Sequence, residues 1–180
     1  MKPSVRLVSR SEALSLVSEA TEIYREVYSG PPYNETAENV ALFQSSWERR
    51  VSREGFLMCA AFDGLGRLLG FSYGWATKVG DVWNTRIRTE LTADEVAKWY
   101  VDCFELMDLA VSARAQGLGL GRSLMNELLA HARNQTALLL THSTATRASE
   151  MYRRYGWTVL RERFQPGSPN VLTLMVKRLR

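Results

Sequence analysis

The sequence predicts an α/β protein in which a single domain, residues 1–180, is built on a mixed sheet. The chain has 180 residues, enough for one domain with a sizeable core. Runs of strand length alternate with amphipathic runs of helix length in the order β-α-α-β-β-β-α-β-α-β-β. The short apolar run from Ala137 to Thr141 is typical of a central strand that is covered on both faces of its sheet.

Residues 1–55 are expected to form one strand and two helices. Val5 to Val8 is an apolar segment of strand length. Ser11 and Asn34 are expected to cap the two helices, and Gly30-Pro31-Pro32 separates them. The apolar faces recur at helical spacing, first in Leu14, Val17, Thr21, Tyr24 and Val27 or Tyr28, then in Val40, Phe43, Trp47 and Val51.

Residues 56–111 are expected to supply core strands. Gly55 ends the preceding helix, and Phe56 to Phe62 reads as a buried strand. A hairpin turn at Asp63-Gly64-Leu65-Gly66-Arg67 leads to a strand with one bulky and one nearly bare face. A bare face predicts that another part of the chain packs closely there. The bulky face holds Leu69, Phe71, Tyr73 and Trp75, and the bare face holds Gly70, Ser72 and Gly74.

Residues 77–99 form an insertion that interrupts this series of core strands. Thr92 is expected to cap a short helix through Ala93 to Val96, and the rest, which includes Trp83, is expected to be a loop. A loop between two core strands often forms part of a site, although a plain surface excursion is the alternative.

The remaining chain, residues 104–180, is expected to alternate strands and helices. The expected elements are strands at Phe104–Val111, Ala137–Thr141, Trp157–Phe164 and Val171–Lys177, helices at Gly119–Asn134 and Thr146–Tyr155, a stop at Gly156, and a turn at Pro166-Gly167-Ser168-Pro169.

The composition favours a reducing compartment. The two cysteines, Cys59 and Cys103, lack metal-like spacing and are expected to be buried free thiols. No apolar run is long enough to span a membrane, and the first residues lack the apolar core of a secretory signal. We therefore expect a cytoplasmic protein with no membrane partner.

Charge is unevenly distributed along the chain. Residues 111–180 hold 11 Lys and Arg against 3 Asp and Glu, whereas residues 79–108 hold 3 against 7. Either both segments are solvated surface, or the basic one binds a polyanion and the acidic one a cation. The pI of about 9.3 also raises a nucleic-acid-binding module as an alternative. The basic residues lack the interleaved aromatic platform of a single-strand binder, so we expect no nucleic acid partner.

A glycine-rich stretch, Gln116-Gly117-Leu118-Gly119-Leu120-Gly121, follows a predicted strand and leads into a helix. The first amides of a helix lack internal partners, and the helix dipole adds positive potential there, so this arrangement suits an anion. Glycine also lets the backbone approach a bulky phosphate. No Lys is present for a Walker loop, and Arg122 stands where the dinucleotide fingerprint needs glycine. The stretch fits Gln/Arg-x-x-Gly-x-Gly/Ala, and a plain tight corner is the alternative.

A second motif follows on the predicted helix 146–155. Ala148-Ser149-Glu150-Met151-Tyr152-Arg153-Arg154-Tyr155-Gly156-Trp157 resembles the Ala-x-x-x-Tyr-x-x-x-Gly-Phe run of the GCN5-related N-acetyltransferases, the GNAT family. The resemblance covers nearly the whole chain and is most specific over residues 104–157. It implies a GNAT-like fold, with a mostly antiparallel sheet of about seven strands whose central strands splay apart. Residues 1–55 would lie on the substrate side, and residues 112–180 would carry the cofactor loop.

The resemblance implies acetyl-coenzyme A as co-substrate and no metal. Leu109, Ala110 and Val111 would pair with the pantetheine arm, and a backbone amide near Leu109 or Ala110 would stabilise the oxyanion. Tyr152 would contact the cofactor and protonate the departing thiolate, with Tyr155 as the competitor and simple packing as the alternative. Gln116 would shape the loop, and the pyrophosphate would be held by the amides of Gly117, Leu118, Gly119, Leu120, Gly121 and Arg122.

The residue that would act as the general base is less closely defined by the resemblance. An amine must lose its proton before it attacks, since a lysine-like ammonium has a pKa of about 10.4. Glu105 is in register with the strand glutamate that is the base in the histone-acetylating branch of the family, and it is favoured. Asp108 is the other carboxylate and points to the opposite face of a regular strand, and deprotonation by water alone is the third alternative. His131 is expected at the surface, and His142, which ends the central strand, is expected to be structural, with a place at the cleft as the alternative.

The acceptor is expected to be a small cationic amine, such as a polyamine, an aminoglycoside or a lysine-bearing peptide. In this fold the acceptor approaches over the early helices and the loop between the third and fourth strands, where the acidic segment lies. Tyr33, Trp75 and Trp83 would supply an aromatic wall. Many relatives carry Asn where this chain has Ala145, and Thr144 or Thr146 would have to substitute.

We therefore expect acetyl transfer to a primary amine by direct attack in a ternary complex. The alternative is a non-catalytic acyl-coenzyme A sensor. The sequence leaves open the acceptor, the acyl-chain preference and the oligomeric state, with a homodimer among the alternatives.

Overall fold

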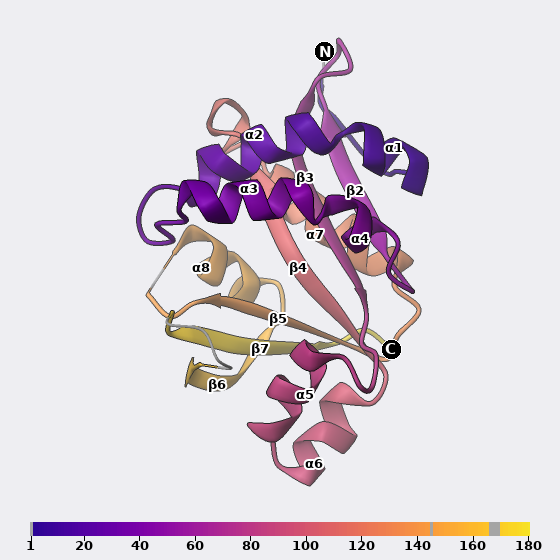
Figure 1. Cartoon of the computed structure of the whole chain (residues 1–180), viewed down its shortest axis with the longest axis vertical. Coiled ribbons are helices and arrows are strands. Elements are labelled where there is room, and N and C mark those ends of the chain that lie inside the picture. The colour runs from indigo at the N-terminus through magenta and orange to yellow at the C-terminus, as the bar shows by residue number, and fades with distance from the viewer. Residues whose placement is uncertain (1, 145, 166–169) are drawn as a thin grey trace. The chain divides into compact units, whose positions relative to one another are not determined.

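The computed structural model describes residues 2–144, 146–165 and 170–180. Seven strands form one sheet in the order β1-β2-β3-β4-β5-β7-β6 (Figure 1). The β4–β5 pair is parallel, whereas β1–β2, β2–β3, β5–β7 and β6–β7 are antiparallel. The predicted mixed, mostly antiparallel sheet is therefore confirmed. The strands are β1 (Ser4–Leu7), β2 (Leu57–Phe62), β3 (Leu68–Ala76), β4 (Cys103–Val111), β5 (Thr136–His142), β6 (Thr158–Phe164) and β7 (Leu172–Arg178).

The helices follow the predicted order, but both opening helices are divided. The first is interrupted at Leu16 and the second at Ser46. The helical elements are α1 (Arg10–Ser15), α2 (Val17–Tyr28), α3 (Ala37–Ser45), α4 (Trp47–Val51), α5 (Val82–Thr89), α6 (Ala93–Glu95), the π-helical turn η1 (Val96–Tyr100), the 3-10 turn η2 (Ala113–Ala115), α7 (Leu120–His131) and α8 (Arg147–Arg154).

The chain divides into two compact units. The first contains Met1–Trp75 and Met107–Ala132, and the second contains Ala76–Leu106 and Arg133–Arg180. The boundary falls inside β4, directly after the residues that pair with β5. The single domain expected over residues 1–180 stays a prediction.

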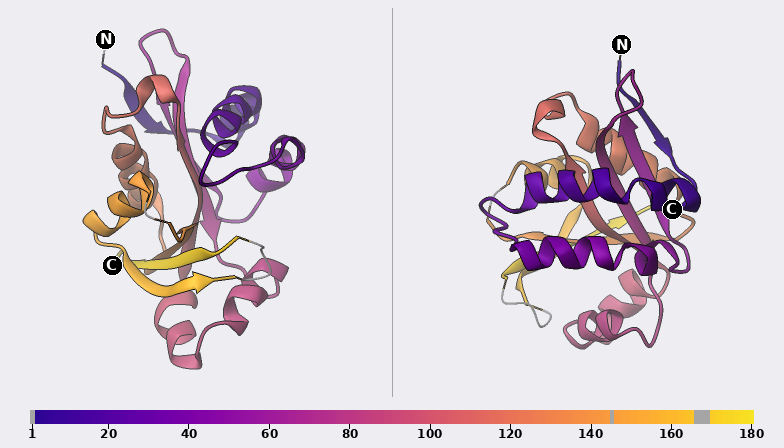
Figure 2. Two further views of the ribbon diagram at one scale, coloured as in Figure 1. Left: turned by 90° about the vertical axis from the view of Figure 1, so that its left-hand side faces the viewer. Right: turned by 45° about the horizontal axis from the view of Figure 1, so that its top comes forward.

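Helices cover both faces of the strands in the first unit. Helices α1 to α4 lie on one face of β2 and β3, and α7 lies on the other (Figure 2). On the second face, the Ser72 hydroxyl donates to the carbonyl of Leu124 in α7 at 3.1 Å. A Cβ added at Gly70 would lie 2.7 Å from the carbonyl oxygen of Ala110 in β4. The face predicted to be bare is therefore packed by a helix and by a neighbouring backbone, as its composition indicates.

An irregularity between β2 and β3 changes one predicted core position. The register shifts between Ala61 and Phe62, so that Phe62 pairs with Leu68. Leu68 thereby joins the core beneath the four helices, in place of the predicted Leu69. A prediction that assumes strict alternation of the side chains between the two faces does not include such a shift.

Two predicted helix caps are wrong by two residues. Ser9 rather than Ser11, and Thr36 rather than Asn34, accept a bond from the amide three residues later, at 3.1 and 3.2 Å. Leu14 is 41% exposed and is not part of the core. The other predicted core positions of these helices are buried or partly buried against the sheet.

The second unit contains the helix that the sequence analysis missed. Val82–Thr89 forms α5, capped by Asp81, where a loop was expected. Its buried residues are Asn84 and Ile87, so its apolar period is too weak to reveal a helix. Thr92 does cap the next helix, through a reciprocal pair of bonds with Glu95, as predicted.

Cys59 and Cys103 are both buried and free, as predicted. Within the described residues, none of the helices combines the length and the apolar character needed to cross a membrane. The turn expected at 166–169 lies outside the described residues.

We expect Gly70→Ala to lower the free energy of unfolding by about 1–3 kcal/mol, because the added methyl group would overlap the β4 backbone. Urea unfolding followed by circular dichroism measures this change. Gly30→Ala is the matched control, since a Cβ at Gly30 would meet no atom within 4 Å. Equal losses in the two variants would contradict the close packing at Gly70.

Candidate functional site

The glycine-rich loop joins β4 to α7 within the first unit. The side-chain amide of Gln116 donates to the carbonyl of Val111 at 3.2 Å, across the turn η2. Gly117 and Gly119 have φ values of 80° and 76°, in the left-handed region that favours glycine. A Cβ at either position would meet no atom within 4 Å. Conformation rather than crowding therefore requires glycine here, and the loop backbone borders open space.

The N-terminus of α7 suits an anion. Gly119 is the N-cap residue, and within the described chain no side chain caps this helix. The first turn contains no acidic residue. The amide of Ser123 already donates inside the helix, to the carbonyl of Gly119 at 3.1 Å. Helix geometry aims the preceding amides at the helix end, where the dipole favours negative charge, so a phosphate group fits this loop.

The end of β4, residues 109–111, is fixed by the first unit. The hydroxyl of Tyr28 in α2 donates to the carbonyl of Leu109 at 2.9 Å. The amide of Ser112 donates to the carbonyl of Leu69 in β3, also at 2.9 Å. The backbone that the resemblance assigns to the pantetheine arm is thus held from two sides.

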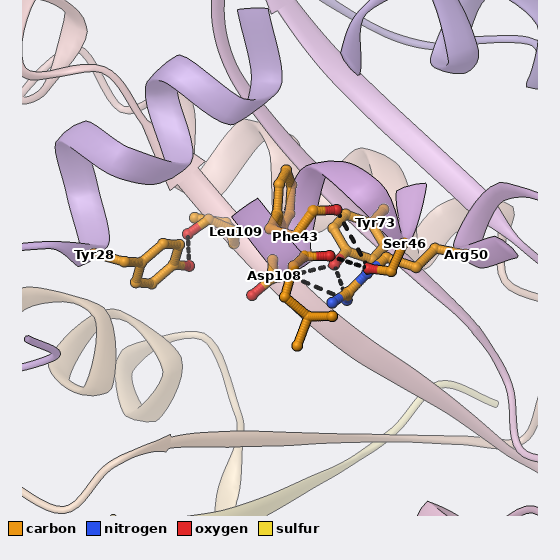
Figure 3. A network of polar contacts seen from close by, with 8 residues as sticks. Tyr28, Phe43, Ser46, Arg50, Tyr73, Asp108 and Leu109 are labelled. Carbon is orange, nitrogen blue, oxygen red and sulfur yellow. Dashed lines mark hydrogen bonds and ion pairs between the residues drawn. The ribbon is translucent and has the colours of Figure 1, made fainter. Parts of the chain in front are cut away.

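A polar network surrounds Asp108 in the first unit (Figure 3). The hydroxyl of Tyr73 donates to Oδ2 of this carboxylate. Nη1 of Arg50 donates to the Tyr73 hydroxyl at 2.7 Å and lies 4.0 Å from Asp108 Oδ2. Nε of Arg50 donates to the Ser46 hydroxyl at 2.9 Å, which donates to the carbonyl of Leu42 at 2.6 Å. The bonds therefore link α3 and α4 to β3 and β4.

Electrostatics keep the proton of this network on the tyrosine. Burial and the neighbouring Asp108 charge raise the pKa of Tyr73 well above its ordinary value. Burial also raises the pKa of Asp108, while the Arg50 charge and the Tyr73 hydrogen bond lower it in part. The Asp108 side chain is 21% exposed. Solvent therefore reaches this carboxylate, and Arg50 and Tyr73 offset part of the rise in pKa that burial causes.

Three tyrosines gather beside this network. The ring of Tyr24 stacks on Phe43, with centroids 4.1 Å apart, and lies 4.7 Å from that of Tyr28. Tyr33 meets Tyr28 edge-on at 4.9 Å. Burial and then the Asp108 charge raise the pKa of Tyr24. We call Tyr24, Tyr28 and Tyr33 the tyrosine cluster.

Glu105 belongs to the second unit. It is 3% exposed and accepts a hydrogen bond from the Tyr100 hydroxyl at 2.5 Å. Burial and the Glu105 charge raise the pKa of Tyr100, so the tyrosine remains the donor. The guanidinium of Arg88 lies over the Tyr100 ring at 5.4 Å and donates to Asn84 at 2.9 Å. The favoured base is thus far more buried than Asp108.

Tyr152 lies on α8, also in the second unit. Thr146 caps this helix through a bond from the Ser149 amide at 3.0 Å, and Gly156, with a φ of 83°, ends it. Tyr152 is 6% exposed, and its ring packs edge-on against Trp157 at 5.9 Å. The Thr146 hydroxyl, which was one of two candidates to substitute for the Asn of relatives, is therefore engaged in capping its own helix.

The remaining polar candidates have local roles. His131 is exposed and lies 3.2 Å from Glu127 one turn earlier, which confirms its surface position. Nδ1 of His142 lies 2.7 Å from the Thr144 hydroxyl. Ala145, where relatives have Asn, lies outside the described residues.

The acidic segment 79–108 serves the structure at several positions. Asp81 caps α5, Glu95 pairs with Arg161 at 2.6 Å, and Asp102 accepts from Asn134 at 2.7 Å. The predicted aromatic wall is also altered, because Trp75 is 5% exposed and carries the Arg53 guanidinium 4.4 Å above its ring. Trp83 packs partly buried against the core of the second unit.

The predicted site residues are divided between the two units. The loop from Gln116 to Arg122, the end of β4 and Asp108 belong to the first, whereas Glu105 and Tyr152 belong to the second. The partners of the two carboxylates were not predicted from the sequence. For Arg50 a signal existed, since it is a charged residue on the apolar face that carries Trp47. Tyr73 and Tyr100 had no comparable signal.

Comparisons with known proteins agree on one family. Residues 15–157 match the model of the acetyltransferase (GNAT) family. A GCN5-like protein acetyltransferase of Mycobacterium tuberculosis is 31% identical over 121 residues, which are 62% of this chain and 59% of that protein. The match thus spans about three fifths of the length of that curated relative.

Solved structures show the same fold at low sequence identity. The PaiA N-acetyltransferase of Thermoplasma acidophilum, in complex with coenzyme A, has a TM-score of 0.65 and 16% identity, with 99% of both chains covered. The ribosomal-protein-S18-alanine N-acetyltransferase of Escherichia coli has a TM-score of 0.64 and 15% identity, with 99% of this chain and 94% of that one covered.

We expect Tyr100→Phe to lower the free energy of unfolding by about 1.5–3 kcal/mol, because a buried carboxylate loses a charge-assisted hydrogen bond. Chemical denaturation at neutral pH measures the loss. Combined with Glu105→Gln, the same substitution should cost less, since the buried charge is gone. Additive losses in the double variant would contradict the coupling between the two side chains.

Proposed function

The chain belongs to the acetyltransferase (GNAT) family, and we propose that it transfers an acetyl group from acetyl-coenzyme A to the primary amine of a small cationic acceptor. The amine attacks directly in a ternary complex. The observation that carries this proposal is the glycine turn at the end of β4, which opens an uncapped twelve-residue helix toward open space. Such a turn suits the pyrophosphate of the coenzyme.

Acetyl-coenzyme A supplies an activated acetyl thioester when bound. The backbone amides from Gly117 to Arg122 would hold its pyrophosphate, and Gln116 would keep the loop closed through Val111. Residues 109–111 would pair with the pantetheine arm, since Tyr28 and Ser112 already hold this backbone in place. The structure of the PaiA N-acetyltransferase, which has a similar fold, contains coenzyme A, which supports coenzyme A as the ligand.

Proton transfers are assigned to side chains on β4 and α8. Glu105 or Asp108 would take the proton that the ammonium group must lose before attack. Tyr152 would donate a proton to the leaving sulfur and regain one from the acylated nitrogen. A backbone amide near Leu109 or Ala110 would stabilise the oxyanion.

The acceptor class follows from charge and aromatic surface in the first unit. Asp108 offers a partly exposed carboxylate, and the tyrosine cluster lies beside it. Carboxylates and aromatic faces both attract an ammonium group, the latter by about 0.5–2 kcal/mol. Because several acids of segment 79–108 are engaged in caps and ion pairs, Asp108 carries more of this argument than the segment as a whole.

We also assign the protein to the cytoplasm. Both of its cysteines are buried and free, which suits a reducing compartment.

A coenzyme A-release assay tests the function. The panel contains spermidine, kanamycin, a lysine-bearing peptide, glutamate and glycine, each with acetyl-coenzyme A. We expect turnover on the cationic amines at neutral pH. Turnover confined to glutamate or glycine would overturn the acceptor class. Saturable binding of acetyl-coenzyme A without turnover on any amine would favour the non-catalytic sensor.

We expect Tyr152→Phe to lower kcat by about 100-fold or more, because the leaving sulfur loses its proton donor. Affinity for acetyl-coenzyme A, measured by calorimetry, should change little, since the phenyl ring still packs against Trp157. Unchanged turnover would remove Tyr152 as the acid. The same loss in Tyr155→Phe instead would transfer the role to that residue.

A further inference from the structure

We propose that Arg50 is a positioning residue that acts through the Tyr73 hydroxyl to hold Asp108 as the carboxylate that takes the amine proton. This inference rests on the proposed function and deepens it, because it selects between the two carboxylates of β4. It also assigns a role to a residue of α4, 58 positions away in the sequence.

The direction of the hydrogen bonds in this network is fixed by chemistry. A guanidinium has donors only, so the Tyr73 oxygen must accept the 2.7 Å bond from Arg50. The single proton of Tyr73 is then available only for Asp108, which accepts it at Oδ2. Because Arg50 cannot accept, Tyr73 cannot turn its proton toward Arg50 when Asp108 changes its protonation state.

This direction assigns different roles to the two carboxylate oxygens. Tyr73 and Arg50 both approach Oδ2 of Asp108. Among the described residues Oδ1 has no hydrogen-bond partner, and the side chain is 21% exposed. A proton taken from the amine of the acetyl acceptor therefore goes to Oδ1. The same geometry disfavours Glu105, which is 3% exposed.

Arg50 is itself held in place for this task. Its Nε donates to the Ser46 hydroxyl at 2.9 Å, and its guanidinium lies 5.5 Å from the centre of the Phe43 ring. The side chain is 25% exposed, so its charge is only partly screened by solvent. At 4.0 Å from Oδ2, this charge favours the ionised carboxylate.

The groups that face Asp108 come from three elements. They are Arg50 on α4, Tyr73 on β3 and Tyr24 on α2. Burial raises the pKa of Asp108, and Arg50 and Tyr73 oppose this rise. We therefore expect loss of either opposing group to raise the pKa of Asp108 further, so that a higher pH is needed for its charged form.

Two measurements test the proposal, and the first needs no turnover. The Asp108 carboxyl is titrated by carbon-detected NMR in the wild type, Arg50→Met, Tyr73→Phe and the control Arg49→Met. Arg49 lies next to Arg50 on the same helix, is exposed and loses the same charge. We expect the pKa of Asp108 to rise by about one pH unit in the first two variants and to stay constant in the control. An unchanged pKa in Tyr73→Phe, which keeps the buried ring, would overturn the network.

The second measurement is the pH profile of kcat/KM for acetylation of spermidine. The acidic limb should move to higher pH in Arg50→Met and Tyr73→Phe, in step with the NMR titration, and stay in place in Arg49→Met. Asp108→Asn should lower kcat by about 100-fold or more and abolish that limb. A loss of rate in Arg50→Met that is equal at every pH would overturn the positioning role.

The outcomes separate this inference from the proposed function. A shifted NMR titration with an unmoved acidic limb would overturn Asp108 as the base and leave acetyl transfer intact. Absence of turnover by the wild type on every amine of the panel would overturn the proposed function, and with it the proton transfer. The NMR titration would still decide whether Arg50 and Tyr73 control the charge of Asp108.

Discussion

The first unit depends on the close approach of β3 and β4 at Gly70. The carbonyl of Ala110 occupies the space that a side chain at Gly70 would need, so no side chain separates the two backbones there. Beyond this point the amide of Ser112 bonds to Leu69, and the chain leaves β4 in a fixed direction toward the loop and α7. The close approach at Gly70 thus fixes the strand from which the glycine turn begins.

Strand β4 carries two buried or partly buried carboxylates, and each accepts a hydrogen bond from a tyrosine. Tyr100 donates to Glu105, and Tyr73 donates to Asp108. The environments differ mainly in exposure, since Glu105 is 3% exposed and the Asp108 side chain 21%. Each pair has an arginine nearby, Arg88 over the Tyr100 ring and Arg50 beside Asp108. Burial penalises the charged form of a carboxylate, so the difference in exposure affects the two carboxylates differently.

Local signals explain which parts of the fold could be predicted. The hairpin, the strands, the cap of α6 and the glycine that ends α8 follow from residues close together in the chain. Helix α5 escaped prediction because Asp81 was not recognised as its cap and only one of its apolar residues, Ile87, is buried. The position of Leu68 escaped because an irregularity in β2 and β3 changes the phase of alternation, and no residue type marks it.

The sequence by itself determined the order of the strands, the glycine turn and the motif around Tyr152, because each depends on neighbouring residues and on the backbone freedom of glycine. Only the tertiary structure decided which side chains surround each carboxylate. Arg50, Tyr73 and Asp108 are separated by 23 and 35 positions, and Tyr28 lies 81 positions from the carbonyl it holds. Such contacts arise when helices pack on a sheet, and no local pattern encodes their pairing, their direction or the resulting charge of Asp108.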